Sequence, residues 1–269
     1  MKVATWNVNS IKVRLEHVLT WLDRETPDVL ALQEIKTKDE DFPVDALRAR
    51  GYSSIVSGQA GYNGVALVSR IEPADVVHGI GGYVDEQKRV LGATFAGVRI
   101  YSLYVPNGEN PESEKYRYKL GWLAALRNLL SVELARYPQL VVAGDFNVAP
   151  DDRDVYDPAA WAGQVLCTPA ERAALASITE LGLRDSFRLF DQPPGKYSWW
   201  DYRAGMFRRN RGLRIDLVLA SRALSQICTN CRIDPEPRGW ERPSDHAPVV
   251  AEFGVADGYV TRAKLTADR

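Results

Sequence analysis

The sequence is poor in cysteine, in histidine and in net charge. Its 269 residues include three cysteines and three histidines, and 34 basic and 35 acidic side chains leave a formal net charge of -1. Three cysteines are too few for a disulfide scaffold, so we expect a reducing, cytoplasmic location. The near-zero charge excludes a polycation, and a nucleic-acid partner would therefore need a local basic patch. No apolar run is long enough to span a bilayer, and the N-terminal residues do not resemble a signal peptide, so we expect no membrane association.

Apolar runs alternate with amphipathic segments along the whole chain. Leu15, Val18, Leu19 and Leu22 follow helical spacing, with Asn9 or Ser10 as the predicted cap. Two more helices are predicted, at about 113–136 and 169–181. Ala96-Gly97 predicts a hairpin turn. The predicted strands cover residues 3–8, 28–33, 52–56, 64–69, 90–95, 98–105, 140–143, 196–200, 214–220, 227–233 and 247–253.

Strands outnumber helices in this pattern, and no linker or repeat interrupts it. Two sheets would have to face each other to bury so many apolar strands, and the long helices would then cover the outer faces. We therefore expect an α/β fold made of two facing β-sheets covered by helices. One domain would span residues 1–254, followed by a polar tail at 255–269.

Polar residues stand where several apolar runs end. Asn7, Glu34, Asp145 and Asn147 lie at or just beyond the C-terminal ends of such runs, and Ser244-Asp245-His246 lies near the end of the chain. Strand ends of this kind can converge on one edge of a sheet pair. Carboxylates, amides and one imidazole suit a hard divalent cation and a phosphate ester.

Each of these residues also has an ordinary structural interpretation. An aspartate after a strand, such as Asp145, is usually a turn residue or a helix cap. His246 alone would more often be a core histidine with satisfied hydrogen bonds. Glu34 resembles many surface glutamates that precede a lysine. Only their joint occurrence favours a catalytic site.

Seven short blocks stand out along the chain. They are Thr5-Trp6-Asn7-Val8-Asn9, Leu32-Gln33-Glu34, Tyr104-Val105-Pro106-Asn107-Gly108, Gly144-Asp145-Phe146-Asn147, Trp200-Asp201-Tyr202-Arg203, Gly212-Leu213-Arg214-Ile215-Asp216 and Ser244-Asp245-His246-Ala247-Pro248. These blocks resemble the exonuclease III family of abasic-site (AP) endonucleases, and they occur in the order that the family shows. The second, fourth and seventh blocks are shared with the wider endonuclease/exonuclease/phosphatase superfamily, whereas the third, fifth and sixth are typical of the DNA-repair branch. The resemblance spans residues 5–248 and implies a four-layered α/β sandwich.

The resemblance implies a metal centre that works with Mg²⁺, or with Mn²⁺. Glu34 corresponds to the principal metal ligand, and Asn7 and Asp245 would complete or support its shell. Asp145 would orient and deprotonate the attacking water or donate to the leaving group. Asp145 and Asn147 are also the candidate ligands of a second ion.

The resemblance also assigns the residues that would contact the scissile phosphate. His246 would contact the phosphate, and Asp216 would hold the imidazole in its protonated form. Asn147 would donate hydrogen bonds to the developing charge, and Tyr104 and Asn107 would reach the same phosphate. Without the family, Tyr104 is equally a strand-end aromatic, Asn107-Gly108 a turn, and Asp216 an outward strand position.

DNA contacts are implied for the segment between residues 199 and 215. Trp199, Leu213 and Ile215 would line a small apolar pocket that admits a sugar without a base, although ordinary core packing explains these residues too. Arg203 and Arg208 would insert into the kinked duplex or brace it.

The sequence therefore predicts a DNA-repair hydrolase. It would be a Mg²⁺-dependent endonuclease that cuts 5′ to abasic sites in duplex DNA, with 3′-phosphatase, 3′-phosphodiesterase and 3′→5′ exonuclease activities, acting as a monomer on abasic sites and blocked 3′ ends. Two alternatives stay open. One is a superfamily phosphoesterase acting on a non-DNA ester, and the other is a DNA-binding module without turnover.

Overall fold

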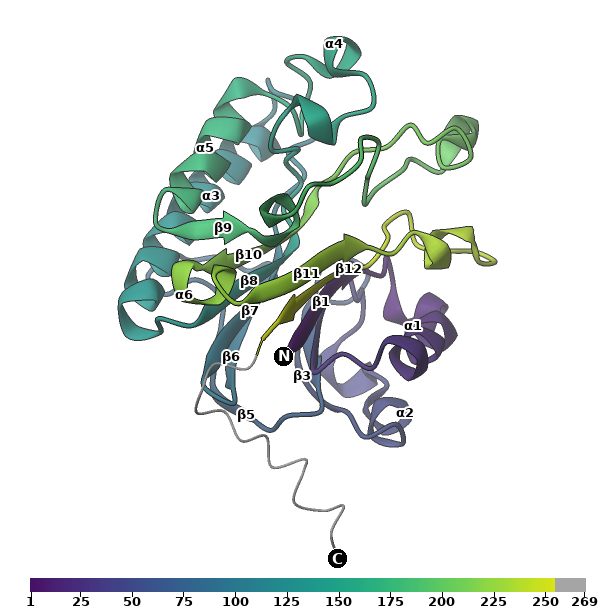
Figure 1. Ribbon diagram of the computed structural model, residues 1–269, viewed down its shortest axis with the longest axis vertical. Helices are drawn as coiled ribbons and strands as arrows, with labels where there is room; N and C mark the ends of the chain where they lie inside the picture. The colour runs from purple at the N-terminus through teal and green to yellow at the C-terminus, as the bar shows by residue number, and fades with distance from the viewer. Residues whose placement is uncertain (255–269) are drawn as a thin grey trace, which may run out of the picture.

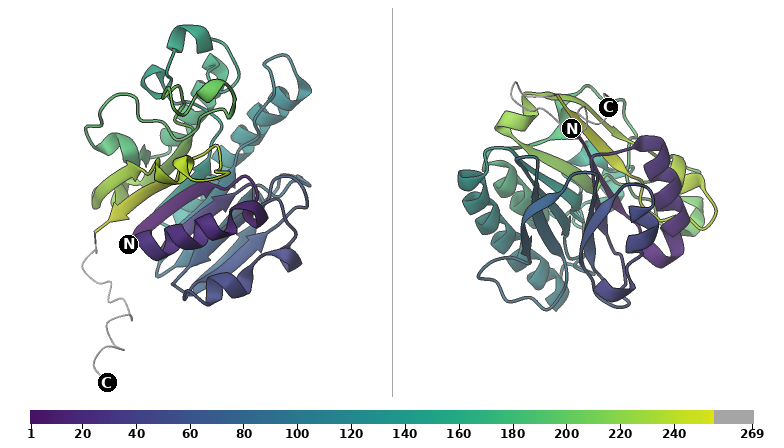
Figure 2. Two further views of the ribbon diagram at one scale, coloured as in Figure 1. Left: turned by 90° about the vertical axis from the view of Figure 1, so that its right-hand side faces the viewer. Right: turned by 90° about the horizontal axis from the view of Figure 1, so that it is seen from below.

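Two six-stranded β-sheets pack face to face in the computed structural model, which describes residues 1–254 (Figure 1). The tail predicted at 255–269 lies outside the described residues. Seen from below in Figure 2, the teal helix α3 and the purple helix α1 lie on opposite sides of the sheet pair. The four layers confirm the predicted two-sheet sandwich. Within residues 1–254, no helix combines the length and the apolar character that crossing a membrane requires.

The first sheet joins segments from both ends of the chain. Its strand order is β11-β12-β1-β2-β4-β3, and only the β1–β2 pair is parallel. The strands are β1 (Lys2–Asn7), β2 (Val29–Gln33), β3 (Ser53–Ser57), β4 (Val65–Ser69), β11 (Cys228–Ile233) and β12 (Val249–Phe253).

The second sheet repeats this plan with the middle of the chain. Its order is β5-β6-β7-β8-β10-β9, and only β7 and β8 run parallel. The strands are β5 (Pro73–His78), β6 (Val90–Phe95), β7 (Val98–Tyr104), β8 (Leu140–Asp145), β9 (Leu183–Asp185) and β10 (Asp216–Ser221). Each sheet thus carries one central parallel pair whose C-terminal ends point to the same edge.

Helices cover the outer faces of both sheets. The α-helices are α1 (Ile11–Glu25), α2 (Val44–Arg48), α3 (Glu114–Arg136), α4 (Pro158–Trp161), α5 (Pro169–Thr179) and α6 (Arg222–Ser225). Short 3₁₀ turns are η1 (Asp39–Asp41), η2 (Asp152–Asp154), η3 (Ser186–Leu189), η4 (Arg203–Gly205) and η5 (Glu236–Gly239). The side chain of Ser113 caps α3 by accepting from the Tyr116 N–H, and Thr168 and Glu171 form a capping box on α5.

Three apolar layers follow from this arrangement. The layer between the sheets contains small residues such as Ala31 and Ala143 beside larger ones such as Ile100. The outer layers hold Trp122 of α3 over one sheet and Trp21 of α1 over the other. Because β2 and β8 are covered on both faces, their residues are buried without alternation, which is why they read as continuous apolar runs.

Two local predictions were wrong. Residues 196–200 do not form a strand, because Trp199 makes only isolated bridges to Leu213 and His246. The side chain of Ser10 makes no capping hydrogen bond at α1. Instead, the Ser10 N–H donates to the Glu34 carbonyl at 2.7 Å, so the strand–helix turn after β1 is fixed by the turn after β2.

Candidate active site

The side chains predicted for catalysis meet at one edge of the sheet pair. Asn7 and Tyr104 are the last residues of β1 and β7, Asp145 is the last residue of β8, and Glu34 directly follows β2. Since β1–β2 and β7–β8 are the parallel pairs, these four positions lie at the same end of the sandwich. The convergence predicted from the ends of the apolar runs is confirmed.

Asn7 connects the two carboxylates across the sheets. Its Nδ2 donates to Glu34 Oε1 at 2.8 Å and to Asp145 Oδ2 at 3.0 Å. Its Oδ1 accepts from the Asn9 N–H at 3.0 Å, which fixes the amide. Asn7 is fully buried. One amide group therefore holds a glutamate of the first sheet and an aspartate of the second side by side.

His246 lies between two aspartates. Its Nδ1 is 2.9 Å from Asp216 Oδ2, and its Nε2 is 3.7 Å from Asp145 Oδ2. Burial lowers the pKa of His246, but the charges of Asp216 and Asp145 outweigh it and raise the pKa to about 10. The ring is therefore an imidazolium at neutral pH, with Nδ1–H donating to Asp216.

Asp145 has the opposite electrostatic setting. Burial and the nearby Asp216 charge raise the pKa of Asp145 to about 7, although His246 acts in the lowering direction. The Asn147 N–H donates to Asp145 Oδ1 at 2.9 Å. A carboxyl group that titrates near neutral pH suits proton transfer with a water molecule.

Two asparagines form a pair beside Asp145. Asn107 Nδ2 donates to Asn147 Oδ1 at 3.1 Å. Asn147 Nδ2 donates to the Val105 carbonyl at 3.0 Å and more weakly to Asp145 Oδ2 at 3.3 Å. The side-chain N–H of Asn147 that makes the weaker bond, to Asp145, is thus the one that can turn to an incoming oxygen.

Two active-site residues have a strained backbone. Glu34 and Asn147 both have a φ of 48°, in the left-handed region. Such a conformation costs on the order of 1 kcal/mol or more for a residue with a Cβ and persists only where its surroundings impose it. Because the backbone turns at these two residues, their side chains lie at the edge of the sheet pair and do not continue the direction of their strands.

Glu34 also has a basic neighbour on the same turn. Lys36 Nζ is 2.8 Å from Glu34 Oε2 and donates to Asn9 Oδ1 at 2.6 Å. Asn9 Nδ2 in turn donates to Asp245 Oδ1 at 3.0 Å, and Trp199 Nε1 donates to Asp245 Oδ2 at 3.0 Å. Asp245 therefore joins the site through Asn9. Burial raises the pKa of Asp245, but His246 and these two donors outweigh it and lower the pKa.

The donor set fits a hard divalent cation. One ligand atom each from Glu34, Asp145 and His246 lie within 4.8 Å of one another. Because His246 is protonated, the oxygen donors of this group are the carboxylates of Glu34 and Asp145, and hard divalent cations select oxygen donors. Asn7 presents its amide nitrogen to both carboxylates and orients them. Direct ligation by Asn7 and Asp245 stays a prediction.

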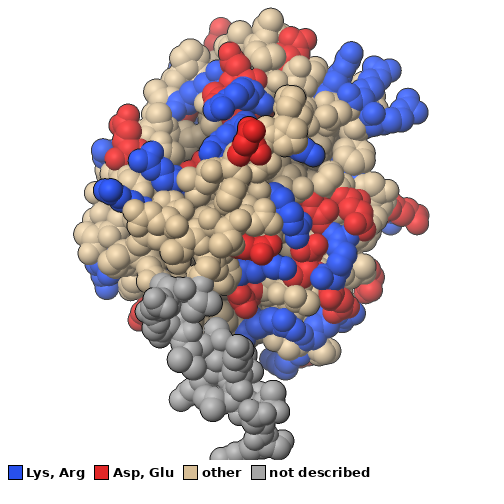
Figure 3. Space-filling view, in the orientation of Figure 1, with Lys and Arg blue, Asp and Glu red and all other residues tan. Residues whose placement is uncertain are grey.

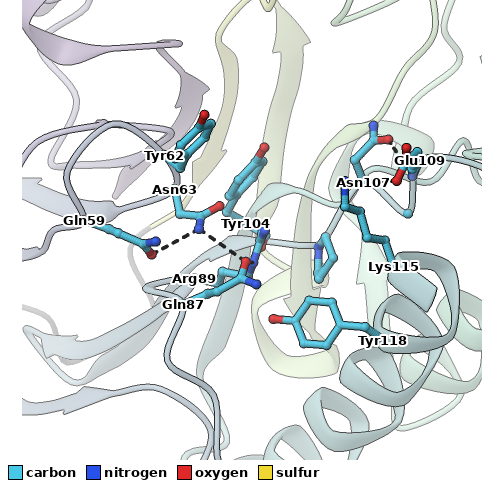
Figure 4. Close-up of a pocket in the computed structure, with 12 residues that line it drawn as sticks. Gln59, Tyr62, Asn63, Gln87, Arg89, Tyr104, Asn107, Glu109, Lys115 and Tyr118 are labelled. Atoms are coloured by element: carbon cyan, nitrogen blue, oxygen red, sulfur yellow. Dashed lines mark hydrogen bonds and ion pairs between the residues drawn. The ribbon is translucent and has the colours of Figure 1, made fainter. Parts of the chain in front are cut away.

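A pocket opens beside the site. Its volume is about 620 Å³, and Tyr104 and Asn107 form part of its wall. Figure 4 shows Tyr62, Asn63 and Arg89 around it, with Lys115 on the side of α3. The guanidinium carbon of Arg89 lies 4.6 Å from the centre of the Tyr104 ring, so a buried cation supports the aromatic ring from below. Burial and the charges of Glu34 and Asp145 raise the pKa of Tyr104.

The predicted DNA-contact residues occupy two different settings. Leu213 and Ile215 are buried in an apolar cluster that also contains Val155 and Leu166, and the half-buried Trp199 packs against it. Arg203 and Arg208 are exposed on the loop that carries η4. In Figure 3 basic side chains gather at the upper right, where Figure 1 shows this green loop.

Some supporting residues escaped the sequence analysis. Arg89 belongs to none of the motifs found in the sequence. Its position directly before β6 is the only sign of its contact with the Tyr104 ring. Lys119 and Glu171 lie at the core-facing helix positions where apolar residues are expected, and a charged residue on an apolar helix face is the signal that would have found them.

Comparison with known proteins identifies relatives over nearly the whole chain. A model of the Endonuclease/Exonuclease/phosphatase family matches residues 4–246. Exodeoxyribonuclease III of Haemophilus influenzae is 35% identical over 266 residues, covering 94% of this chain and 100% of that protein. The 3′ phosphatase NExo from Neisseria, solved with a product DNA hairpin, is 46% identical with a TM-score of 0.93, covering 95% of this chain and 100% of that one. An AP endonuclease from Archaeoglobus fulgidus is 40% identical with a TM-score of 0.92 and the same coverage.

Proposed function

The chain belongs to the endonuclease/exonuclease/phosphatase family, and we propose that it is a Mg²⁺-dependent DNA-repair nuclease that cuts duplex DNA on the 5′ side of abasic sites. The same centre carries out 3′-phosphatase, 3′-phosphodiesterase and 3′→5′ exonuclease reactions. Relatives named for exodeoxyribonuclease III, 3′ phosphatase and AP endonuclease activities support this range. The observation that carries the proposal is the single Asn7 amide that holds both Glu34 and Asp145 beside an imidazolium.

Each reaction attacks a phosphate ester, and the site has a group for each requirement. Glu34, with Asn7 and Asp245 in support, would hold Mg²⁺, and the ion would supply positive charge that makes the phosphorus easier to attack. Asp145 accepts a proton from the attacking water, because its pKa of about 7 lets it act as a base near neutral pH. The second-ion hypothesis for Asp145 and Asn147 uses the same oxygens.

The remaining groups stabilise the negative charge that develops on the phosphate. His246 presents a protonated Nε2. The Asp216 carboxylate, which accepts from Nδ1–H, keeps the ring in its charged form. Asn147 turns its weakly used N–H to a phosphate oxygen, and Asn107, which donates to Asn147 Oδ1, reaches the same phosphate. Tyr104 borders the same space and presents a neutral hydroxyl, since its pKa is raised.

DNA binding is proposed along two surfaces that flank the phosphate. The exposed Arg203 and Arg208 contact the duplex backbone or its kink. The half-buried Trp199 forms the apolar wall that accepts a baseless sugar, and the buried Leu213 and Ile215 support it from behind. The 620 Å³ pocket beside Tyr104 holds the strand next to the cut. We also propose a single catalytic domain over residues 1–254, a monomeric state and a cytoplasmic location.

A comparison of substrates under one buffer tests the proposal. Duplexes carrying an internal abasic site, a 3′-phosphate or an intact 3′ end are incubated with Mg²⁺, with Mn²⁺ and with EDTA, and the rate on each is measured. We expect metal-dependent cleavage of the abasic duplex and release of the 3′-phosphate. Parallel incubations with an inositol phosphate and with sphingomyelin test the non-DNA alternative. Tight DNA binding without turnover in every arm would support a binding module and reject the enzyme.

A further inference from the structure

A lysine is completely buried behind the two asparagines of the active site. Lys119 is on α3 and has no exposed side-chain surface. A buried ammonium group is costly unless all its N–H groups are bonded. Here each one has a partner, and two of the three partners belong to active-site residues.

The bonds of Lys119 reach the backbone of both catalytic loops. Its Nζ donates to the Asn147 carbonyl at 2.6 Å and to the Asn107 carbonyl at 3.0 Å. The third N–H donates to Glu171 Oε1 on α5. Lys119 thus contacts the loop after β7 and the loop after β8 with one charged group, and charge-assisted bonds of this kind are about twice as strong as neutral ones.

Glu171 is itself fixed, so the ammonium group cannot shift easily. Its Oε1 also accepts from the Leu166 N–H at 3.0 Å, and its Oε2 accepts from the Thr168 N–H at 3.0 Å and from the Thr168 hydroxyl at 2.8 Å. Glu171 is as buried as Lys119. The ion pair is therefore a rigid support under the active site.

The consequence for the asparagine side chains is direct. Asn147 has a left-handed backbone, and its carbonyl is the group that Lys119 holds. The Asn107 side chain bonds to the Asn147 side chain, so the two residues are held at both their carbonyls and their amides. Removing the donor would release the strained turn and let the amides move away from the phosphate.

We propose that Lys119 is a positioning residue that sets the Asn107 and Asn147 amides for phosphate cleavage. This inference rests on the proposed function, because it assigns those amides to the scissile phosphate. A purely structural interpretation, in which the ion pair only joins α3 to α5, makes a different prediction and can be separated from it.

The decisive variant removes both charges. Lys119→Met alone leaves the Glu171 carboxylate buried without its partner and so threatens folding. The double variant Lys119→Met/Glu171→Gln removes the unpaired charge. The glutamine oxygen can still complete the capping box with Thr168, while the Leu166 N–H loses its acceptor. We expect it to fold, with kcat on the abasic duplex reduced at least about tenfold and KM changed by less than about threefold.

A second buried ion pair gives the matched control. Arg99 and Glu133 join the start of β7 to α3, at the opposite end of that strand from Tyr104, and their Nε–Oε2 distance is 2.7 Å. Arg99→Met/Glu133→Gln loses a pair of the same kind. We expect it to lower the melting temperature and to leave kcat unchanged.

Two further readouts complete the test. The side-chain ¹⁵NH₂ signals of Asn107 and Asn147 report their position without turnover, and we expect them to shift and broaden only in the Lys119 double variant. A folded double variant with parental kcat and unchanged signals would overturn the inference, as would an equal loss of kcat in the Arg99 control. Absence of turnover in the parental protein would instead reject the proposed function, and the amide signals would still decide the positioning role.

Discussion

Asn7 and Asp145, which are 138 positions apart in the chain, are hydrogen-bonded across the two sheets at 3.0 Å. The same Asn7 nitrogen donates to Glu34 on its own sheet. Two like-charged carboxylates are thereby held together in a buried place before any cation binds, which raises the free energy of that arrangement. A cation held at this edge would relieve the repulsion.

Replacing Glu34 by Gln tests the metal site. The amide keeps the size of the side chain but loses the negative charge that attracts Mg²⁺. We expect activity at saturating Mg²⁺ to fall by about 100-fold or more, and Mg²⁺ binding measured by calorimetry to weaken strongly. Glu40→Gln, an exposed glutamate paired with Lys38, is the control and should retain parental binding. Equal Mg²⁺ affinity in both variants would contradict the assignment.

Asp216→Asn tests the charge on His246. Without the Asp216 carboxylate, the largest influence that raises the pKa of His246 above its usual value is lost, so this pKa should fall below about 10. An NMR titration of the metal-free protein measures it directly. We expect kcat to drop by about 100-fold, since the general contribution of a positioned proton donor is of this size. An unchanged titration would show that another group holds the proton.

Asp145→Asn should stabilise the metal-free protein as the pH rises. The pKa of Asp145 is raised to about 7 by folding, so its protonated form contributes stability that is present below about 4 and is lost as the pH rises through 7. Asparagine does not ionise and avoids this loss. Urea unfolding in EDTA at several pH values should therefore show a gap between variant and parent that grows from pH 4 to pH 8, by on the order of 4 kcal/mol. A constant gap would mean that the pKa is not raised.

Arg203→Ala/Arg208→Ala should weaken DNA binding and leave the chemistry intact. Both side chains are exposed, so folding should be unaffected. We expect KM to rise with little change in kcat, and the slope of log Kd against log salt to decrease by about 2. Arg48→Ala/Arg70→Ala removes two exposed arginines at the far end of the first sheet and should change neither quantity. Equal effects of the two pairs would indicate nonspecific attraction.

Gly144 has no room for a side chain. A Cβ there would lie 2.1 Å from the Leu103 carbonyl oxygen on the neighbouring strand. Gly144→Ala should therefore lower the free energy of unfolding by on the order of 3 kcal/mol. Gly121 lies on the exposed side of α3 with nothing within 4 Å, so Gly121→Ala should raise it by about 1 kcal/mol. Urea unfolding curves of both variants give the comparison.

The sequence predicted the central elements well because burial on both faces leaves a strong pattern. The limits of β6 (Val90–Phe95) agree at both ends, and the long helix α3 begins one residue after its predicted start. Short or exposed elements left no such pattern. The edge strand β5 has mostly exposed side chains, and β9 has three residues, so neither was predicted.

Which residues form the candidate site could be predicted from the sequence, but the hydrogen bonds that join them were much harder to predict. That Asn7, Glu34 and Asp145 gather at one edge follows from the ends of their apolar runs. The roles of Asn9 as a bridge to Asp245 and of Lys119 behind Asn147 depend on contacts between residues far apart in the chain. No local pattern encodes such contacts, because they arise only when the two sheets are stacked.

The layer between the sheets contains several alanines, among them Ala31 on β2 and Ala143 on β8. These small side chains set the spacing between the two sheets, and each sheet carries part of the active site at its end. An added methyl group there would push the walls apart and lengthen the Asn7–Asp145 contact before it threatened the fold. The reaction rate is thus sensitive to the distance between the sheets. Among related sequences, the residues allowed at these positions should therefore be restricted by their effect on the reaction rate sooner than by their effect on the melting temperature.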